Sequence, residues 1–272
     1  KGILMDNFQL YDENKKGTII LSHYRSGGTQ LLLTLTEMLK SNGIKISNFK
    51  ELNFDTLSGK SYKTQTEEML KHTNYATILL NNSLVISYFY NQGYFDELSK
   101  NYNLVILERK DKLMSLLSLP IWEELINKGL FHKDWKTPLE QTQDMVEFHN
   151  YLLNHKLDCM KLHLGWENDI FQKGENGEPN YYYYLSYLMK AYQDELNMLK
   201  LLKEEYKLHT IYYEDYEFIP MNLSKYYEKF SESSKKKVLV KSQNKIPYIH
   251  RNFIDYFDIY TQKVLSDWNF DD

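Results

Sequence analysis

The segment Thr18–Leu39 reads TIILSHYRSGGTQLLLTLTEML and decides the fold class. It opens with a short apolar, β-branched run, Thr18–Ser22, which is typical of a strand buried on both faces. After a loop that contains two adjacent glycines, apolar residues recur at helical spacing over Thr29–Asn42, and Gly43 supplies a stop. The segment therefore predicts a buried strand, a tight loop and a helix in direct succession.

The same alternation continues along the chain. Further strand patterns are Ala76–Leu80, Leu104–Leu107 and Leu208–Tyr213, and helical patterns cover Gln92–Lys100, Asp111–Lys128, Pro138–His155, Tyr181–Tyr206 and Arg251–Trp268. Apolar strands that alternate with helices indicate an α/β fold, with a parallel sheet flanked by helices. No linker or repeat divides the sequence, which predicts a single domain over residues 1–272. Ligands of such sheets bind at the carboxyl ends of the strands.

Composition excludes several classes of protein. With 42% hydrophobic and 26% charged residues, the 272-residue chain is not intrinsically disordered. A net charge of −4 gives no basic excess, so no nucleic-acid partner is expected, and an anionic ligand must be met by a local cluster of positive groups. The single cysteine, Cys159, and the absence of ligand spacing among the histidines predict no metal site.

The hydrophobic pattern bears on location. No run approaches the roughly 18 apolar residues needed to span a bilayer, so no membrane span is expected. The amino-terminal stretch is too interrupted for a signal peptide. These features predict a soluble, cytoplasmic protein.

The loop between the first strand and helix suits an anion. Gly27 and Gly28 permit backbone conformations closed to other residues, which lets main-chain N–H groups converge. The helix that follows adds unpaired N–H groups and the positive end of its dipole. Ser26 and Thr29 offer hydroxyl donors, and Arg25 offers a positively charged fork. The pattern predicts a socket for a phosphate or a sulfate ester, and the alternative is a simple tight turn.

This unit resembles the 5′-phosphosulfate loop of the sulfotransferase family, in which a strand enters a [K/R]-[S/T]-G-[S/T/G]-T loop and then a helix. The Arg-Ser-Gly variant is most similar to the branch that contains bacterial trehalose-type and tyrosylprotein sulfotransferases. The resemblance implies a P-loop NTPase-like sulfotransferase fold, 3′-phosphoadenosine 5′-phosphosulfate (PAPS) as donor, and no metal. It also implies that the donor is bound by Arg25, Ser26, Gly27, Gly28, Thr29 and Gln30, with Arg25 stabilising the bridging and leaving oxygens.

A second motif follows the strand at Leu104–Leu107. Arg109 stands just past this strand, and Ser115 and Ser118 lie three residues apart in the next helical pattern. The family binds the 3′-phosphate of the donor with an Arg at a strand end and a Ser in the helix that follows. The resemblance implies Arg109 and Ser118 for this role, while Ser115 is nearer the spacing of the cytosolic branch and stays open. Taken alone, the segment also fits a solvated charged turn.

The third motif is the tripeptide Tyr213-Glu214-Asp215. Family members carry Tyr-Glu-Asp at a strand end with the Tyr near the adenine, which implies that Tyr213 contacts the base by stacking or through its edge. Glu214 and Asp215 are expected to organise the turn. Two departures are expected to loosen donor affinity: a Gly-Gly pair where hydroxyl residues are common, and the absence of the usual Pro after Glu108.

The general base is assigned by the same resemblance. Some branches use a Glu after the first helix, and Glu51 falls in a segment similar to the one that carries it. The alternatives are that Glu51 is a surface residue in a loop and that His72 is the base. Glu37, inside the first helix, is expected to be solvated.

The resulting interpretation is a sulfotransferase that moves a sulfuryl group from PAPS to a hydroxyl of a carbohydrate, a tyrosine or a small alcohol. Two alternatives remain. One is a nucleotide or small-molecule kinase, disfavoured because the loop lacks the Lys-Ser/Thr pair of GxxxxGK[ST]. The other is a non-catalytic protein of the same fold that binds a nucleotide or a partner. The sequence leaves the acceptor and the oligomeric state open.

Overall fold

The computed structural model divides the chain into two compact units, which are considered separately below. The first comprises residues 1–110 and 194–238, and the second comprises residues 111–193 and 239–272. Within them the structure describes residues 4–5, 8–23, 26–52, 64, 71, 74–81, 83–112, 115–116, 118, 121, 125, 128–130, 133, 136–155, 181–216 and 262.

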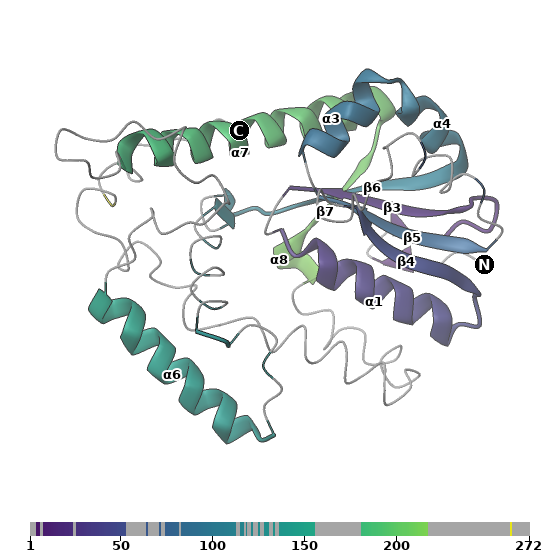
Figure 1. Ribbon diagram of the computed structural model, residues 1–272. Coiled ribbons are helices and arrows are strands. Elements are labelled where there is room, and N and C mark those ends of the chain that lie inside the picture. The colour runs from purple at the N-terminus through teal and green to yellow at the C-terminus, as the bar shows by residue number, and fades with distance from the viewer. Residues whose placement is uncertain are drawn as a thin grey trace. The chain divides into compact units, whose positions relative to one another are not determined.

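A parallel sheet of five strands forms the centre of the first unit (Figure 1). Its order is β4-β5-β3-β6-β7, and every neighbouring pair is parallel. The strands are β3 (Gly17–Ser22), β4 (Ile46–Leu52), β5 (Tyr75–Leu80), β6 (Tyr102–Glu108) and β7 (His209–Tyr212). A separate antiparallel pair joins β1 (Leu4–Met5) to β2 (Phe8–Gln9). The predicted α/β class with a parallel sheet is confirmed.

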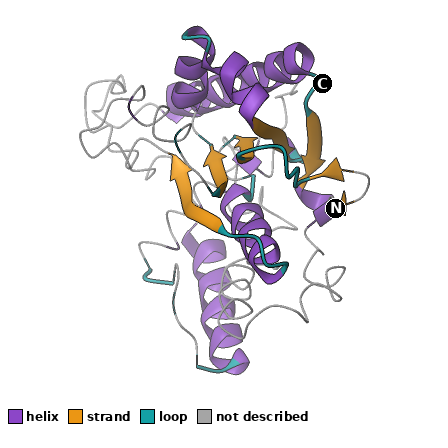
Figure 2. Ribbon diagram, turned by 90° about the vertical axis from the view of Figure 1, so that its right-hand side faces the viewer, coloured by secondary structure: helices purple, strands orange, loops and turns teal. Residues whose placement is uncertain are grey.

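Helices cover both faces of the sheet, because its central strands are apolar on both sides (Figure 2). Alternate residues of each strand serve opposite faces, so that Ile20 packs with one core and Ile19 and Leu21 with the other. The first core contains the apolar stripe of α1 (Gly28–Ser41). The second contains side chains of α3 (Ser83–Asn91), α4 (Tyr94–Asn101) and the C-terminal part of α7 (Tyr181–Tyr206).

Most predicted elements are confirmed, and the differences have local causes. The helix predicted over Gln92–Lys100 begins later, at Tyr94, because Gly93 adopts a left-handed conformation (φ 69°) that separates α4 from α3. Neither α3 nor β4 was predicted. Of the helix predicted over Arg251–Trp268 the structure describes Gln262, which is helical.

The described part of the second unit is mainly helical. It includes α6 (Pro138–His155) and the first half of α7, and both helices have the bounds predicted from sequence. Reciprocal contacts similar to a capping box start α6: the N–H of Glu140 donates to Thr137 Oγ1 at 3.1 Å, and the Glu140 carboxylate accepts the N–H of Lys136, one residue before the N-cap, at 2.9 Å. Among the described helices, none combines the length and the apolar composition that crossing a bilayer requires.

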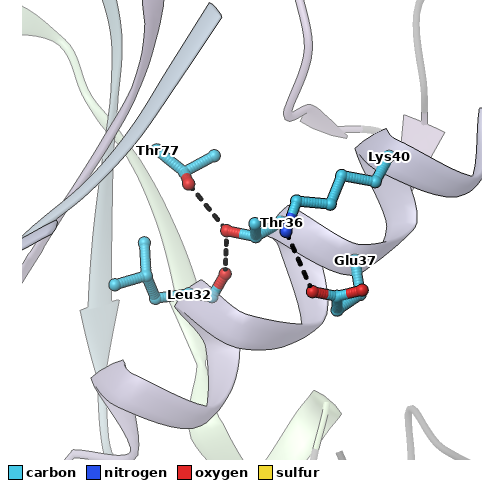
Figure 3. Close-up of polar contacts among 5 residues, drawn as sticks. All are labelled: Leu32, Thr36, Glu37, Lys40 and Thr77. Carbon is cyan, nitrogen blue, oxygen red and sulfur yellow. Dashed lines mark hydrogen bonds and ion pairs between the residues drawn. The ribbon is translucent and has the colours of Figure 1, made fainter. Parts of the chain in front are cut away.

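Polar contacts also fix α1 on the sheet (Figure 3). The hydroxyl of Thr36 donates to the carbonyl of Leu32 at 2.7 Å and lies 2.6 Å from the hydroxyl of Thr77 on β5. Both threonines are buried, so this pair needs its partners inside the protein. The expectation that Glu37 is solvated is wrong: the residue is 6% exposed, and its carboxylate pairs with Lys40 at 3.2 Å.

Replacing Thr36 with Val should destabilise the fold more than replacing Thr77 with Val. Thr36→Val leaves the buried hydroxyl of Thr77 without the partner it has here, at a cost of about 1–3 kcal/mol, whereas Thr77→Val leaves Thr36 bonded to Leu32. The double variant should recover part of the loss, because both polar groups are then gone. Urea unfolding gives the free energy of unfolding of the two single variants and the double variant. Equal losses in the single variants that add in the double variant would contradict this account of the contact.

The fold should lose stability in alkali. Burial raises the pKa of Tyr75 and of Tyr102 to about 12 from an ordinary 10.0, and the hydrogen bond with Thr18 only partly offsets this for Tyr75. The unfolded chain releases these protons above pH 10 while the folded protein retains them, so stability is complete below pH 10 and declines toward pH 12. Tyr102→Phe should flatten this decline in urea titrations at pH 9, 10 and 11. An unchanged slope would show that Tyr102 does not contribute.

Candidate functional site

The carboxyl ends of three strands meet at one edge of the sheet. Ser22, the last residue of β3, lies opposite Leu107 of β6, and Glu108 lies opposite Tyr212 of β7. After β3 the chain enters α1 on one face and continues to β4, whereas after β6 it returns through α7, on the other face, to β7. The connection from β3 runs toward the β4 side of the sheet, and the connection from β6 runs toward the β7 side. The boundary between β3 and β6 is therefore a topological switch point, where ligands of α/β sheets bind.

The glycine pair after β3 starts α1, and its two members are needed for different reasons. Gly27 is the N-cap with φ 88°, a left-handed conformation that disfavours residues with a side chain. Gly28 is needed for space, since a Cβ atom there would lie 2.7 Å from Leu79 Cδ1 and 2.9 Å from Ser22 Oγ. The first turn of α1 therefore lies directly against β3 and β5.

Main-chain N–H groups face the start of α1, because the helix has no side-chain cap. The N–H groups of Gln30 and Leu31 both donate to the carbonyl of Gly27 at 3.1 Å, so they are used within the first turn. The positive end of the helix dipole lies at this turn, where the sequence predicts an anion, and that anion stays a prediction. Thr29 is partly exposed at this turn.

Ser26 stabilises the loop through a hydrogen bond to the main chain. Its hydroxyl donates to the carbonyl of His23 at 2.8 Å, and the residue is 1% exposed. This bond closes a short turn between the strand and the helix. The structure thus uses the Ser26 proton for the backbone, and its predicted contact with a sulfuryl donor stays a prediction.

Arg109 is the main charged residue at this edge. It follows β6 directly, is 7% exposed, and its guanidinium carbon lies 4.2 Å from the centre of the Tyr213 ring. The Nε atom is buried and has no hydrogen-bond partner in the described part of the chain, nor does a described carboxylate pair with the guanidinium. A buried positive charge without an anionic partner is costly. Among the described residues, the site therefore has a buried positive charge without an anionic partner, near the carboxyl end of β3.

Side-chain contacts join the residue after Arg109 to the end of β7 and the residues that follow it. The main-chain N–H of Lys110 donates to Glu214 Oε2 at 2.9 Å, and the Lys110 ammonium lies 5.4 Å from the centre of the Tyr212 ring. Together with the stacking of Arg109 on Tyr213, these contacts join the segment after β6 to the Tyr-Glu-Asp motif.

Of the other predicted site residues, some are described by the structure and some are not. Tyr213 is 5% exposed with one face covered by Arg109, and its predicted contact with adenine stays a prediction. Ser118 is buried and donates to the carbonyl of Ser115 at 2.7 Å, and both serines belong to the second unit, so their pairing with Arg109 stays a prediction. Arg25 and His72 lie outside the described residues.

Glu51 lies in a strand and not in a loop. It is the next-to-last residue of β4 and lies opposite Leu79 of β5. The alternative of a loop residue is therefore wrong, while its side chain lies outside the described part and its role as a base stays a prediction.

Sequence reasoning missed two groups at this site. Ser22 is 1% exposed, and its hydroxyl, beside Gly28, has no hydrogen-bond partner among the described residues. A hydroxyl residue at the last position of a buried apolar strand is the signal that marks it. The contact between Lys110 and Glu214 joins residues 104 positions apart and has no local signal.

Across the described ranges, no three His, Cys, Asp or Glu side chains are grouped so as to hold a metal ion. Comparison of the chain with protein-family models, with curated proteins and with solved structures gave no match.

Replacing Arg109 with Met should leave the protein at least as stable as the unchanged chain. The thioether side chain fills similar space without a buried charge, and such replacements are often neutral or stabilising. Arg109→Ala should be less stable than Arg109→Met, because it leaves a cavity beside Tyr213. Urea unfolding compares the three. A loss of more than about 1 kcal/mol in Arg109→Met would show that the guanidinium is held by partners of its own.

Proposed function

We propose that the protein is a sulfotransferase that transfers the sulfuryl group of PAPS to the hydroxyl group of an acceptor, and that its core is a P-loop-like sulfotransferase fold. The acceptor is a carbohydrate, a tyrosine or a small alcohol. The donor site is the edge of the sheet where the glycine loop, Arg109 and Tyr213 follow β3, β6 and β7.

The observation that carries the proposal is the buried guanidinium of Arg109. A terminal phosphate offers the planar fork two oxygens and the charge that it lacks in the described protein. The second anion site is proposed at the N-terminus of α1, after the neighbouring strand, because the positive end of the helix dipole lies there and no side chain caps the helix. PAPS carries two anionic groups on its ribose, the 3′-phosphate and the 5′-phosphosulfate, and two neighbouring anion sites would match that chemistry.

In the proposed reaction, the acceptor oxygen forms a bond to sulfur as the bond from sulfur to the bridging phosphate oxygen breaks. The products are a sulfate ester and adenosine 3′,5′-bisphosphate, and the proton of the acceptor hydroxyl passes to a base, for which Glu51 is proposed. As in phosphoryl transfer, catalysis rests on alignment and on stabilising charge at the transferred group. Arg25 and the N–H groups of the loop are proposed to carry that charge, and no step requires a metal.

The first test is calorimetric titration with adenosine 3′,5′-bisphosphate in the absence of metal, with ATP and Mg²⁺ for comparison. We expect tight binding of the bisphosphate and weak binding of ATP. Arg109→Met should weaken binding of the bisphosphate by about 1.5–3 kcal/mol, the scale of a hydrogen bond to a charged group. It should barely affect binding of adenosine 5′-phosphosulfate, which lacks the 3′-phosphate.

Lys100→Ala is the matched control for this measurement. It also removes one positive charge, but from an exposed position just before β6, at the opposite edge of the sheet. Its affinity for both ligands should stay close to that of the unchanged protein. Equal losses for both ligands in Arg109→Met would place Arg109 away from the 3′-phosphate. Absence of bisphosphate binding would reject the sulfotransferase proposal, and Mg²⁺-dependent ATP turnover would favour a kinase.

A further inference from the structure

Glu214 is the residue of the Tyr-Glu-Asp motif whose function is open, and it lies beside Arg109. Its carboxylate accepts the main-chain N–H of Lys110 at 2.9 Å. Lys110 is the residue directly after Arg109, so this bond fixes the peptide unit that follows the buried arginine. The motif therefore contacts the segment after β6 at two adjacent points, the ring of Tyr213 under the guanidinium and the carboxylate of Glu214 on the next N–H.

The two contacts constrain Arg109 in different ways. The Tyr213 ring, whose centre lies 4.2 Å from the guanidinium carbon, attracts the cation and blocks movement toward that side. The bond to Glu214 fixes the backbone from which the side chain departs, and hydrogen bonds to a charged acceptor are about twice as strong as neutral ones. Since β6 ends at Glu108, the ladder of the sheet no longer holds this peptide, and an added bond is needed to define its position.

The direction of the Glu214 carboxylate is also informative. A carboxylate next to a buried guanidinium would ordinarily form an ion pair and occupy the fork. Here it is used by a main-chain N–H, and no described carboxylate pairs with Arg109. Within the described part of the chain, Glu214 thus contacts the segment of Arg109 without forming an ion pair with the guanidinium.

We propose that Glu214 is a positioning residue, which aims Arg109 at the terminal phosphate of the donor through the N–H of Lys110. This inference rests on the proposed function for the identity of the anion, but the positioning itself is a property of the protein without ligand. It predicts that the acceptor atom of residue 214 matters and that its negative charge does not.

Glu214→Ala and Glu214→Gln separate these two properties. Both variants remove the same charge, but the amide oxygen of Gln can still accept the N–H of Lys110, whereas Ala cannot. Glu204→Ala is the control, since it makes the same change of charge at an exposed position on α7.

The first readout needs no ligand. The sequence contains three arginines, Arg25, Arg109 and Arg251, so protein labelled with ¹⁵N-arginine gives three Nε–H signals, and Arg109→Lys identifies that of Arg109. The Tyr213 ring should shift this signal upfield. We expect the shift to be reduced in Glu214→Ala and kept in Glu214→Gln and Glu204→Ala.

The second readout is calorimetric binding of adenosine 3′,5′-bisphosphate and of adenosine 5′-phosphosulfate. Glu214→Ala should lower the affinity for the bisphosphate about tenfold, because the supporting hydrogen bond is lost near the proposed 3′-phosphate site. The affinity for the phosphosulfate should change less. Glu214→Gln should bind the bisphosphate at least as tightly as the unchanged protein, since it keeps the acceptor and removes a negative charge near the ligand.

The outcomes separate the two proposals. An unaltered Arg109 signal in Glu214→Ala would overturn the positioning role, whatever the ligand affinities are. Equal changes of signal and affinity in Glu214→Gln and Glu214→Ala would also overturn it, since charge and not the acceptor would then be responsible. If the unchanged protein does not bind the bisphosphate, the proposed function fails, and the Arg109 signals alone decide whether Glu214 positions the arginine.

Discussion

The close approach of the chain at both ends of β3 is the constraint on which the rest of the structure depends. A Cβ atom at Gly17 would lie 2.2 Å from the carbonyl oxygen of Ala76, and one at Gly28 would lie 2.7 Å from Leu79. Both contacts are with β5, so the absence of side chains at these two positions sets how tightly β3, β5 and α1 pack. The contact of Thr36 with Thr77 continues the same interface two turns further along α1. Because α1 starts so close to β3, its N-terminus faces the switch point of the sheet.

Much of this fold could be predicted from the sequence, because the central strands are short apolar runs bounded by turn residues. The predicted strand at Ala76–Leu80 and the helices α6 and α7 match the structure closely. The edge strand β4 could not be predicted, since its pattern ISNFKEL is interrupted by polar residues and its pairing with β5 shifts register. The sequence of α3, SLVISYFYN, is rich in residues that favour strands, and packing in the second core makes it helical.

The candidate site could be predicted only in part, for a physical reason. The glycine loop and its helix are local, so spacing and residue type are enough to suggest an anion site. The partners of Arg109 and Lys110 are not local: Tyr213 contacts Arg109 and Glu214 contacts Lys110 only because β7 pairs with β6 in the sheet. Burial also changes roles in ways that residue type does not reveal. Ser26 bonds to the backbone, and one face of the Tyr213 ring is occupied by the guanidinium.

The proposed anion site has to be reconciled with the acidic charge of the whole chain. With a net charge of −4, the field of the whole chain repels such a ligand, and attraction must come from groups placed within a few ångströms of it. Arg109 and the N-terminus of α1 meet this need, because each is a positive group at the carboxyl edge of the sheet. The Glu214 carboxylate accepts a main-chain N–H, and no carboxylate of the described residues pairs with the Arg109 guanidinium. In the proposed arrangement, this carboxylate holds the segment that follows the arginine and leaves the guanidinium to the ligand.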